Sequence, residues 1–298
     1  MASLQDIKRR IRSVRNTRKI TKAMELVAGA RLRRAEQRIT QMRDYADRMQ
    51  ELTAGTARAA SSLRGLTLLQ RREVRSVGIV ALTGDRGLAG AFNAQILRRA
   101  TAAERSLRAE GTEVRWLVVG RKGRSTLEFR RYRLDGAWAG FTDRPSYHDA
   151  QAIAHRLTEL YNEEEIDRAV LVYNHYESPL VQRVTEQEIL PISEEAFGRE
   201  EAEEEGRDAA LLGDFIYEPE PEQILERLLP VYLETEIYRA LLESAASELG
   251  ARMTAMRNAS KNAAELIDSL TLDMNRARQA EITQEILEVV AGADALTS

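Results

Sequence analysis

The sequence contains no cysteine, only six prolines and few aromatic residues, and these absences exclude several kinds of chemistry. Without cysteine the chain can form no disulfide, thiol nucleophile or thiolate metal site. No apolar run reaches the roughly 18 residues that span a bilayer, and the first residues lack the apolar core of a signal peptide. We therefore expect a soluble chain without a membrane span.

The composition favours long, solvent-facing helices over one large core. Charged residues make up 31% of the 298 residues and aromatic residues only 5%, with many alanines, leucines, glutamates and arginines. The net charge of -3 is unevenly distributed along the chain. Residues 194–208 are rich in glutamate, whereas the first 34 residues contain eleven basic side chains: Lys8, Arg9, Arg10, Arg12, Arg15, Arg18, Lys19, Lys22, Arg31, Arg33 and Arg34.

The C-terminal residues from Gln223 to about Ala291 carry a heptad pattern. Sixteen of the twenty heptad core positions are apolar, from Ile224 through Leu249 and Leu270 to Leu287. A spacing of 3.5 residues held over this length is typical of a helix that supercoils with another helix. At 1.5 Å per residue such a helix would be roughly 100 Å long. Pro230 should kink or break it, because proline lacks the backbone N–H.

A second long helix is predicted at the N-terminus, from about Leu4 to Ser61, where there is no proline. Its apolar positions also follow a 3.5-residue spacing. Midway, Arg18, Thr21 and Glu25 occupy the core positions. The apolar face is expected to shift there to Ile20, Met24 and Val27. With heptad helices at both ends of one chain, we expect an antiparallel two-helix coiled coil made of the two termini. The residues between them would form an inserted domain.

The insert should be a Rossmann-like α/β domain. Apolar runs predict strands at 77–82, 114–119, 170–176 and 181–189, and helical spacing predicts helices at 93–110 and 147–161. The last two strands are joined by a hairpin at 177–179, so we expect a mostly parallel sheet with one antiparallel edge. The predicted fold class is thus a mixed α/β protein with four segments: an N-terminal coiled-coil helix (1–65), the insert (75–192), an acidic loop (193–213) and a C-terminal coiled-coil helix (214–298).

The glycine-rich segment 83–90 lies where a phosphate-binding loop would be, after a strand and before a helix. It lacks both the Gly-Lys-Ser/Thr ending and the three-glycine dinucleotide pattern, and Asp85 would repel a phosphate. A tight turn or a partner-contact loop is the favoured interpretation. Arg121 and Lys122, between two glycines, likewise indicate a solvated turn rather than an anion site.

Catalytic and metal-binding patterns are missing. His148, His155 and His175 do not have metal-ligand spacing, and no Gly-x-Ser-x-Gly motif is present. We expect no catalytic residue, no metal and no cofactor. Nucleic acid is also disfavoured as a partner of the basic N-terminal helix, because no aromatic residue precedes Tyr45 to stack on bases. An acidic protein partner or a solvated face fits better.

The last turns of the C-terminal helix are apolar around most of their circumference. Ile282, Ile286, Leu287, Val289 and Val290 present more apolar surface than one partner helix can cover. A free helix end of this kind would aggregate. We expect it to lie inside an apolar collar made by other subunits.

Four sequence blocks resemble the gamma subunit family of F-type ATP synthases, bacterial type. The blocks occur in family order and cover both helical arms and much of the insert: Lys19–Ala28, Asp85–Asn93, Glu248–Met256 and Ala277–Ile286. The resemblance implies a central rotor shaft of a proton-translocating enzyme that catalyses nothing itself. Its partners would be the hexameric ring of alpha and beta subunits, the epsilon subunit and the membrane c-ring. Its location would be peripheral, at the cytoplasmic face of the cell membrane.

The same resemblance assigns partner contacts to particular residues. Arg9, Arg10, Lys19 and Met24 fall where family members meet acidic loops of beta. Arg278, Gln279 and Thr283 match positions that engage a beta-subunit loop. The apolar tip, with Ile282, Ile286 and Leu287, would lie in the sleeve of the ring. Foot contacts with the membrane ring would involve Arg86 and Leu88 in the glycine-rich segment, and Tyr217.

Two hypotheses from other classes remain beside the rotor. A coiled-coil scaffold would dimerise through its own heptads, and a nucleotide-binding enzyme would use the insert. Cross-links between the two terminal helices distinguish the scaffold from the rotor. The rotor predicts cross-links within one chain, and the scaffold predicts them between chains. Binding of ATP to the isolated chain, sensitive to Asp85 or Arg86, would favour the enzyme.

Overall fold

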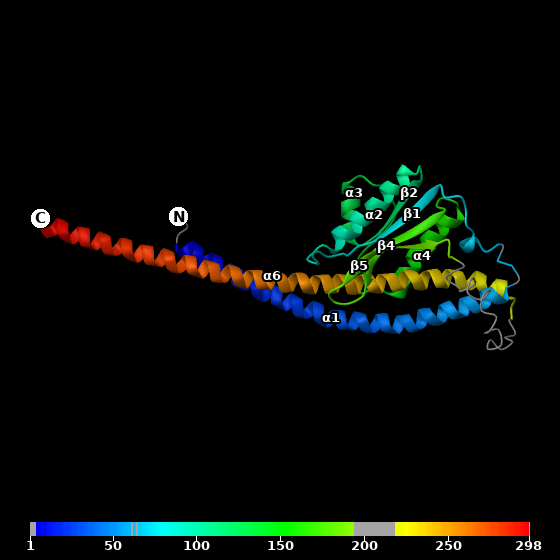
Figure 1. The fold of residues 1–298 in the computed structure, drawn as a ribbon, viewed down its shortest axis with the longest axis horizontal. Coiled ribbons are helices and arrows are strands. Elements are labelled where there is room, and N and C mark those ends of the chain that lie inside the picture. The colour runs from blue at the N-terminus through cyan, green and yellow to red at the C-terminus, as the bar shows by residue number, and fades with distance from the viewer. Residues whose placement is uncertain (1–3, 61, 64, 194–217, 298) are drawn as a thin grey trace. The chain divides into compact units, whose positions relative to one another are not determined.

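The computed structural model describes residues 4–60, 62–63, 65–193 and 218–297, with side chains described up to residue 291. Its elements are α1 (Leu4–Ala59), the 3-10 turn η1 (Thr67–Leu69), β1 (Ser76–Leu82), α2 (Phe92–Ala109), β2 (Glu113–Val119), α3 (Arg121–Phe129), β3 (Leu134–Trp138), α4 (Tyr147–Asn162), β4 (Arg168–Tyr176), β5 (Gln182–Leu190) and α6 (Pro221–Thr297) (Figure 1). The long terminal helices pack together around an inserted α/β sheet, as the sequence predicts, and the sheet has five strands instead of the four expected.

Two compact units make up the chain, and the terminal helices contribute to both. One unit consists of Met1–Gly29 with Arg252–Ser298, and the other consists of Ala30–Ala251. The first unit is an antiparallel helix pair. Ile7 and Ile11 of α1 pack with Ile267 of α6, and Leu270, Met274 and Ala277 border the same cluster. At the other end of the pair, a side chain at Gly29 would lie 3.4 Å from Met253 Sδ.

The second unit is built around the sheet, whose strand order is β3-β2-β1-β4-β5. β1 pairs in parallel with β2 and β4, and β2 pairs in parallel with β3. β5 is antiparallel to β4 and forms one edge, as expected from the hairpin. All seven residues of β1 are buried, which is what a central strand covered on both faces requires.

Helices cover both faces of this sheet (Figure 1). α2 and α3 pack on one face, where Val77, Ile79 and Trp116 meet Ile96 and Leu127. On the other face α4 and α6 pack together, with core residues that include Leu82, Leu117, Leu157, Leu233 and Ile237. The sheet therefore packs against the part of α6 that belongs to this unit.

Several local predictions need correction. The sequence did not predict α3 or β3, and the segment from Gly120 to Gly123 is the start of a helix rather than a turn. Pro230 lies inside α6 and does not break it, while Pro221 occupies its first residue. The heptad register is also shifted: Leu266 is 48% exposed and its neighbour Ile267 is buried. Between Leu241 and Gly250 every residue of α6 is buried, so no single apolar stripe can describe this helix.

Candidate functional site

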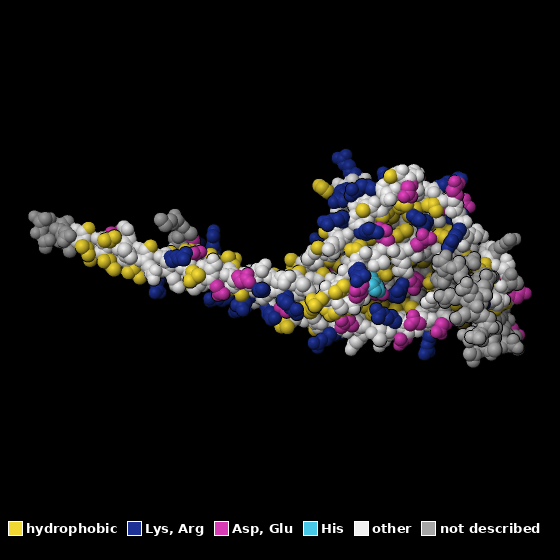
Figure 2. All heavy atoms as spheres, viewed as in Figure 1, with side chains coloured by type: hydrophobic (Ala, Val, Ile, Leu, Met, Phe, Trp, Pro, Cys, Tyr) yellow, Lys and Arg dark blue, Asp and Glu magenta, His cyan; other side chains and the backbone are white. Residues whose placement is uncertain are grey.

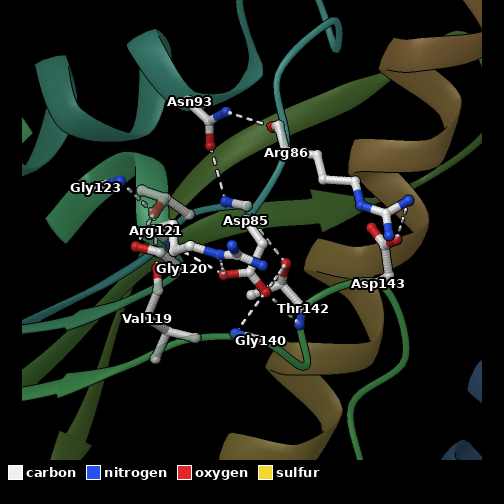
Figure 3. A network of polar contacts seen from close by, with 12 residues as sticks. Asp85, Arg86, Asn93, Val119, Gly120, Arg121, Gly123, Gly140, Thr142 and Asp143 are labelled. Carbon is white, nitrogen blue, oxygen red and sulfur yellow. Dashed lines mark hydrogen bonds and ion pairs between the residues drawn. The ribbon is translucent and has the colours of Figure 1, made fainter. Parts of the chain in front are cut away.

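The glycine-rich loop after β1 is organised by the carboxylate of Asp85 (Figure 3). Asp85 Oδ1 accepts a hydrogen bond from the backbone N–H of Arg121 at 3.0 Å, at the first turn of α3. Its Oδ2 accepts from the N–H groups of Gly140 at 2.8 Å and Thr142 at 3.1 Å, and from the Thr142 hydroxyl at 3.1 Å. Burial raises the pKa of Asp85, but these hydrogen bonds outweigh it and bring the pKa below its ordinary value.

This carboxylate lies at the N-terminus of α3, whereas the phosphate cradle considered from the sequence would lie at the N-terminus of α2. α3 also lies very close to the end of β1, because a side chain at Gly123 would lie 2.5 Å from Thr83 Oγ1. The Gly123 N–H already donates to that hydroxyl at 2.9 Å. We call this arrangement, in which Asp85 accepts from the N–H groups of Arg121, Gly140 and Thr142, the Asp85 clasp.

Arg86 and Leu88 point away from this clasp and are exposed. Arg86 forms an ion pair with Asp143 at 3.2 Å, and Arg31 of α1 approaches the same carboxylate at 3.4 Å. Leu88 is 63% exposed and has a φ of 64°, in the left-handed region that a leucine rarely adopts. The backbone thus holds an apolar side chain in solvent, as a partner-contact loop requires. Tyr217, the third predicted foot residue, lies outside the described residues.

The predicted N-terminal contacts lie along α1 in the helix-pair unit. Arg9, Arg10 and Lys19 are exposed and Met24 is half-buried. Arg9 forms an ion pair with Asp6, one turn away. Arg10 and Lys19 form no ion pair with a described residue, so these two exposed cations are accessible to an acidic partner.

The expected shift of the apolar face of α1 is wrong, because two of the polar core positions stay buried while Ile20 and Val27 remain exposed. Thr21 and Glu25 are 9% and 8% exposed, whereas Ile20 is 60% exposed. Lys22 lies 3.0 Å from Glu25 and Arg257 of α6 lies 3.1 Å from it. The hydrogen bond from Lys22 lowers the pKa of Glu25, and the hydrogen bond from Arg257 acts in the same direction. The Arg257 contact could not be predicted from the sequence, because it joins residues 232 positions apart.

At the other end of the chain, the predicted tip residues are all exposed. Arg278, Gln279 and Thr283 lie on successive turns of α6, and the Thr283 hydroxyl donates to the backbone carbonyl of Gln279 at 2.9 Å. Arg278 forms no ion pair with any residue in the described ranges. The large apolar side chains of the tip are 45–71% exposed: Ile282, Ile286, Leu287, Val289 and Val290.

The predicted contacts do not form one cluster within either unit. Arg86 and Leu88 belong to the sheet unit, while the basic and the tip residues belong to the helix pair. Among the described residues, no group of three or more acidic or histidine side chains could hold a metal ion. The described helices include none with an apolar stretch long enough to cross a membrane.

Comparison with known proteins identifies the family. A family model described as ATP synthase matches residues 3–296. The ATP synthase gamma chain of Rubrobacter xylanophilus is 49% identical over 301 residues and aligns over all of both chains. The chain belongs to the ATP synthase gamma chain family. The gamma chain of Nostoc punctiforme is 44% identical over 315 residues, again over all of both chains.

A solved structure agrees with this membership. A chain in the central stalk and c-ring structure of the Tetrahymena thermophila mitochondrial ATP synthase is 28% identical, with a TM-score of 0.57, and the match covers 81% of this chain and 99% of that one. The resemblance that the four sequence blocks indicate is therefore confirmed. As a gamma chain, the protein is a non-catalytic rotor subunit of the central stalk of an F-type ATP synthase.

Proposed function

We propose that the chain couples rotation of a membrane c-ring to the catalytic sites of a hexamer of alpha and beta subunits. The observation that carries this proposal is the exposed apolar tip of α6. Beyond Ala277 every described side chain up to Ala291 is exposed, including five large apolar ones. Complete burial of each such side chain is worth about 1.5–3 kcal/mol. A hydrophobic sleeve formed by the ring would supply that burial.

The helix pair acts as the shaft. Torque reaches the tip only if α1 and α6 move as one body, and the packing of Ile7 and Ile11 on Ile267 supports this. The shaft is asymmetric, because α6 continues past the end of its apolar contacts with α1. As it turns, each beta subunit meets a different face in succession. A partner changes a conformational equilibrium only through different contacts with its states, and this sequence of faces provides them.

Particular residues carry these contacts. Arg278, Gln279 and Thr283 engage a loop of beta, and Arg9, Arg10, Lys19 and Met24 meet acidic loops of beta. Arg86, Leu88 and Tyr217 belong to the foot, which contacts the c-ring and the epsilon subunit. The ring translocates protons, and the chain lies at the cytoplasmic face of the cell membrane as a peripheral subunit.

Purification from native membranes tests this function. An affinity-tagged full-length chain, extracted with mild detergent, should bring down alpha, beta, epsilon and c-ring subunits. A variant with Ile282→Asp and Ile286→Asp should retain less alpha and beta. Recovery of the tagged chain as a self-associated scaffold without these subunits would contradict the proposal.

A further inference from the structure

A basic patch surrounds α3 in the sheet unit, next to the glycine-rich loop that contains Arg86 and Leu88. The basic patch consists of six cationic residues on α3 and the segment that follows it, together with one aromatic residue: Arg121, Lys122, Arg124, Arg130, Arg131, Arg133 and Phe129. All seven side chains are exposed. Lys and Arg side chains gather over α3 in the space-filling view (Figure 2). Glu128 is the one acidic residue between Arg121 and Arg133.

Half of these cations have an acidic neighbour and half do not. Arg124 lies 2.8 Å from Glu128, Arg121 lies 3.6 Å from Asp85 and Arg133 lies 4.0 Å from Asp135. Within the part of the chain that the structure describes, no ion pair is formed by Lys122, Arg130 or Arg131. The basic patch therefore carries at least three uncompensated positive charges.

Phe129 makes the basic patch unlike an ordinary solvated surface. Its side chain is 88% exposed, the highest value among the exposed large hydrophobic residues of the described chain. Leu127, two residues earlier on α3, is fully buried, so α3 packs on the sheet through Leu127 and not through the Phe129 ring. An aromatic ring among cations at the end of a helix is typical of residues that anchor a protein at a membrane interface.

We propose that the basic patch binds the anionic phospholipid headgroups of a bilayer. The uncompensated cations pair with lipid phosphates, and the Phe129 ring enters the boundary between headgroups and acyl chains. Each cation close to an anionic bilayer contributes about 1 kcal/mol, and the attraction falls off within a Debye length. The basic patch thus provides a direct lipid contact for a chain in which no described helix is able to cross the membrane.

Single-stranded nucleic acid fits the basic patch less well. Nonspecific binding of single strands uses several aromatic platforms along a groove, one for each stacked base. Tyr132, the nearest other aromatic residue, is half-buried and packs on Trp116 with ring centroids 5.3 Å apart. Phe129 is thus the only exposed ring of the patch. The proposed lipid binding is argued only from the residues of the basic patch, so it does not depend on the rotor assignment.

Flotation with vesicles tests the proposal. The full-length chain is mixed with vesicles of phosphatidylcholine alone or with a quarter phosphatidylglycerol, at low and high salt. The patch variant carries Lys122→Gln, Arg130→Gln and Arg131→Gln. A matched control removes the same charge from exposed positions of α1, with Arg12→Gln, Arg15→Gln and Arg18→Gln. A third variant, Phe129→Ser, removes the ring alone, and circular dichroism verifies that all variants are folded.

We expect binding to the anionic vesicles that weakens as salt increases. The patch variant should lose about 100-fold in partitioning, a larger loss than that of the α1 control. Phe129→Ser should weaken binding at both salt concentrations. A patch variant that partitions as well as the α1 control would overturn the proposal. It would also be overturned if the three cations proved necessary for binding single-stranded DNA but not vesicles.

Discussion

Arg257 of α6 donates a hydrogen bond from Nε to the Glu25 carboxylate of α1 at 3.1 Å, across 232 residues of sequence. Glu25 is 8% exposed, so this ion pair lies against the packed side of the helix pair. Ile7 and Ile11 of α1 meet Ile267 further along α6, which sets the two helices antiparallel. The core positions of α1 and α6 are thus buried against each other within one chain. A coiled-coil scaffold would instead bury them against a second copy of the chain.

A double-mutant cycle should detect the coupling between these two residues. We expect Glu25→Gln and Arg257→Gln to show a coupling energy of about 0.5 kcal/mol in denaturant unfolding, because Arg257 remains partly exposed. The control is a second cycle that combines Glu25→Gln with Arg276→Gln. Arg276 is an exposed arginine that forms no ion pair with a described residue. Equal coupling in both cycles would show that the Glu25–Arg257 contact is not formed.

An engineered disulfide can distinguish pairing within a chain from pairing between chains. A side chain at Gly29 would lie 3.4 Å from Met253 Sδ, and there is no native cysteine to compete. Oxidised Gly29→Cys with Met253→Cys should therefore migrate as a cross-linked monomer on a non-reducing gel. Gly29→Cys alone provides the control. Predominantly dimeric product from the double variant would favour the scaffold.

The Asp85 clasp should contribute to the stability of the sheet unit. Asp85→Ala leaves three backbone N–H groups without their acceptor, so we expect a loss of about 2 kcal/mol at neutral pH. Asp44→Ala, at an exposed position of α1, should change stability by less than about 0.5 kcal/mol. Chemical denaturation followed by tryptophan fluorescence measures both. An equal effect of the two substitutions would contradict the clasp.

The same clasp has a predictable pH dependence. The pKa of Asp85 in the folded chain is below its ordinary value of 3.8, so the charged form favours the folded state. Its contribution should be complete above that ordinary value and should be lost as the pH falls through the lower, folded pKa. The stability difference between the natural chain and Asp85→Ala should thus be constant from pH 7 to about 5 and shrink below about 4. A difference that grows on acidification would contradict the assignment.

The sequence predicted the parts of the fold that follow one regular pattern. The buried run of β1 and the helical spacing of α2 and α4 were sufficient to place those elements. α3 was missed because Gly120 and Gly123 suggested a turn. In fact Gly120, with a φ of 94°, allows the chain to enter the helix, and Gly123 allows α3 to lie against Thr83.

β3 and the core of α6 could not be predicted for related reasons. β3 is a short edge strand with a glycine at its centre, so it shows no alternation of polar and apolar residues. α6 is buried on all sides between Leu241 and Gly250, which removes the heptad signal there. The candidate contacts were predicted from family resemblance, and the role of Asp85 as an acceptor emerged only from the packing of distant N–H groups around it.

Loss of the tip contacts should slow the complex without abolishing nucleotide binding. We expect Arg278→Ala with Gln279→Ala to lower ATP turnover of the reconstituted complex roughly tenfold, because charge-assisted hydrogen bonds to beta are worth about 1.5 kcal/mol. Nucleotide affinity should be nearly unchanged. The control is Lys261→Ala with Glu265→Ala, an exposed pair 3.9 Å apart on α6. Turnover equal to that of the control would argue against the contact.

Rotation of the chain itself is the most direct test of the rotor assignment. Because the chain has no cysteine, Ser106→Cys on the exposed side of α2 gives a single attachment point for a bead on the reconstituted complex of alpha, beta and gamma subunits. With alpha and beta immobilised, the bead should rotate in one direction when ATP is added and stop when ATP is removed. ATP hydrolysis at the normal rate with a bead that only fluctuates about a fixed position would contradict the assignment.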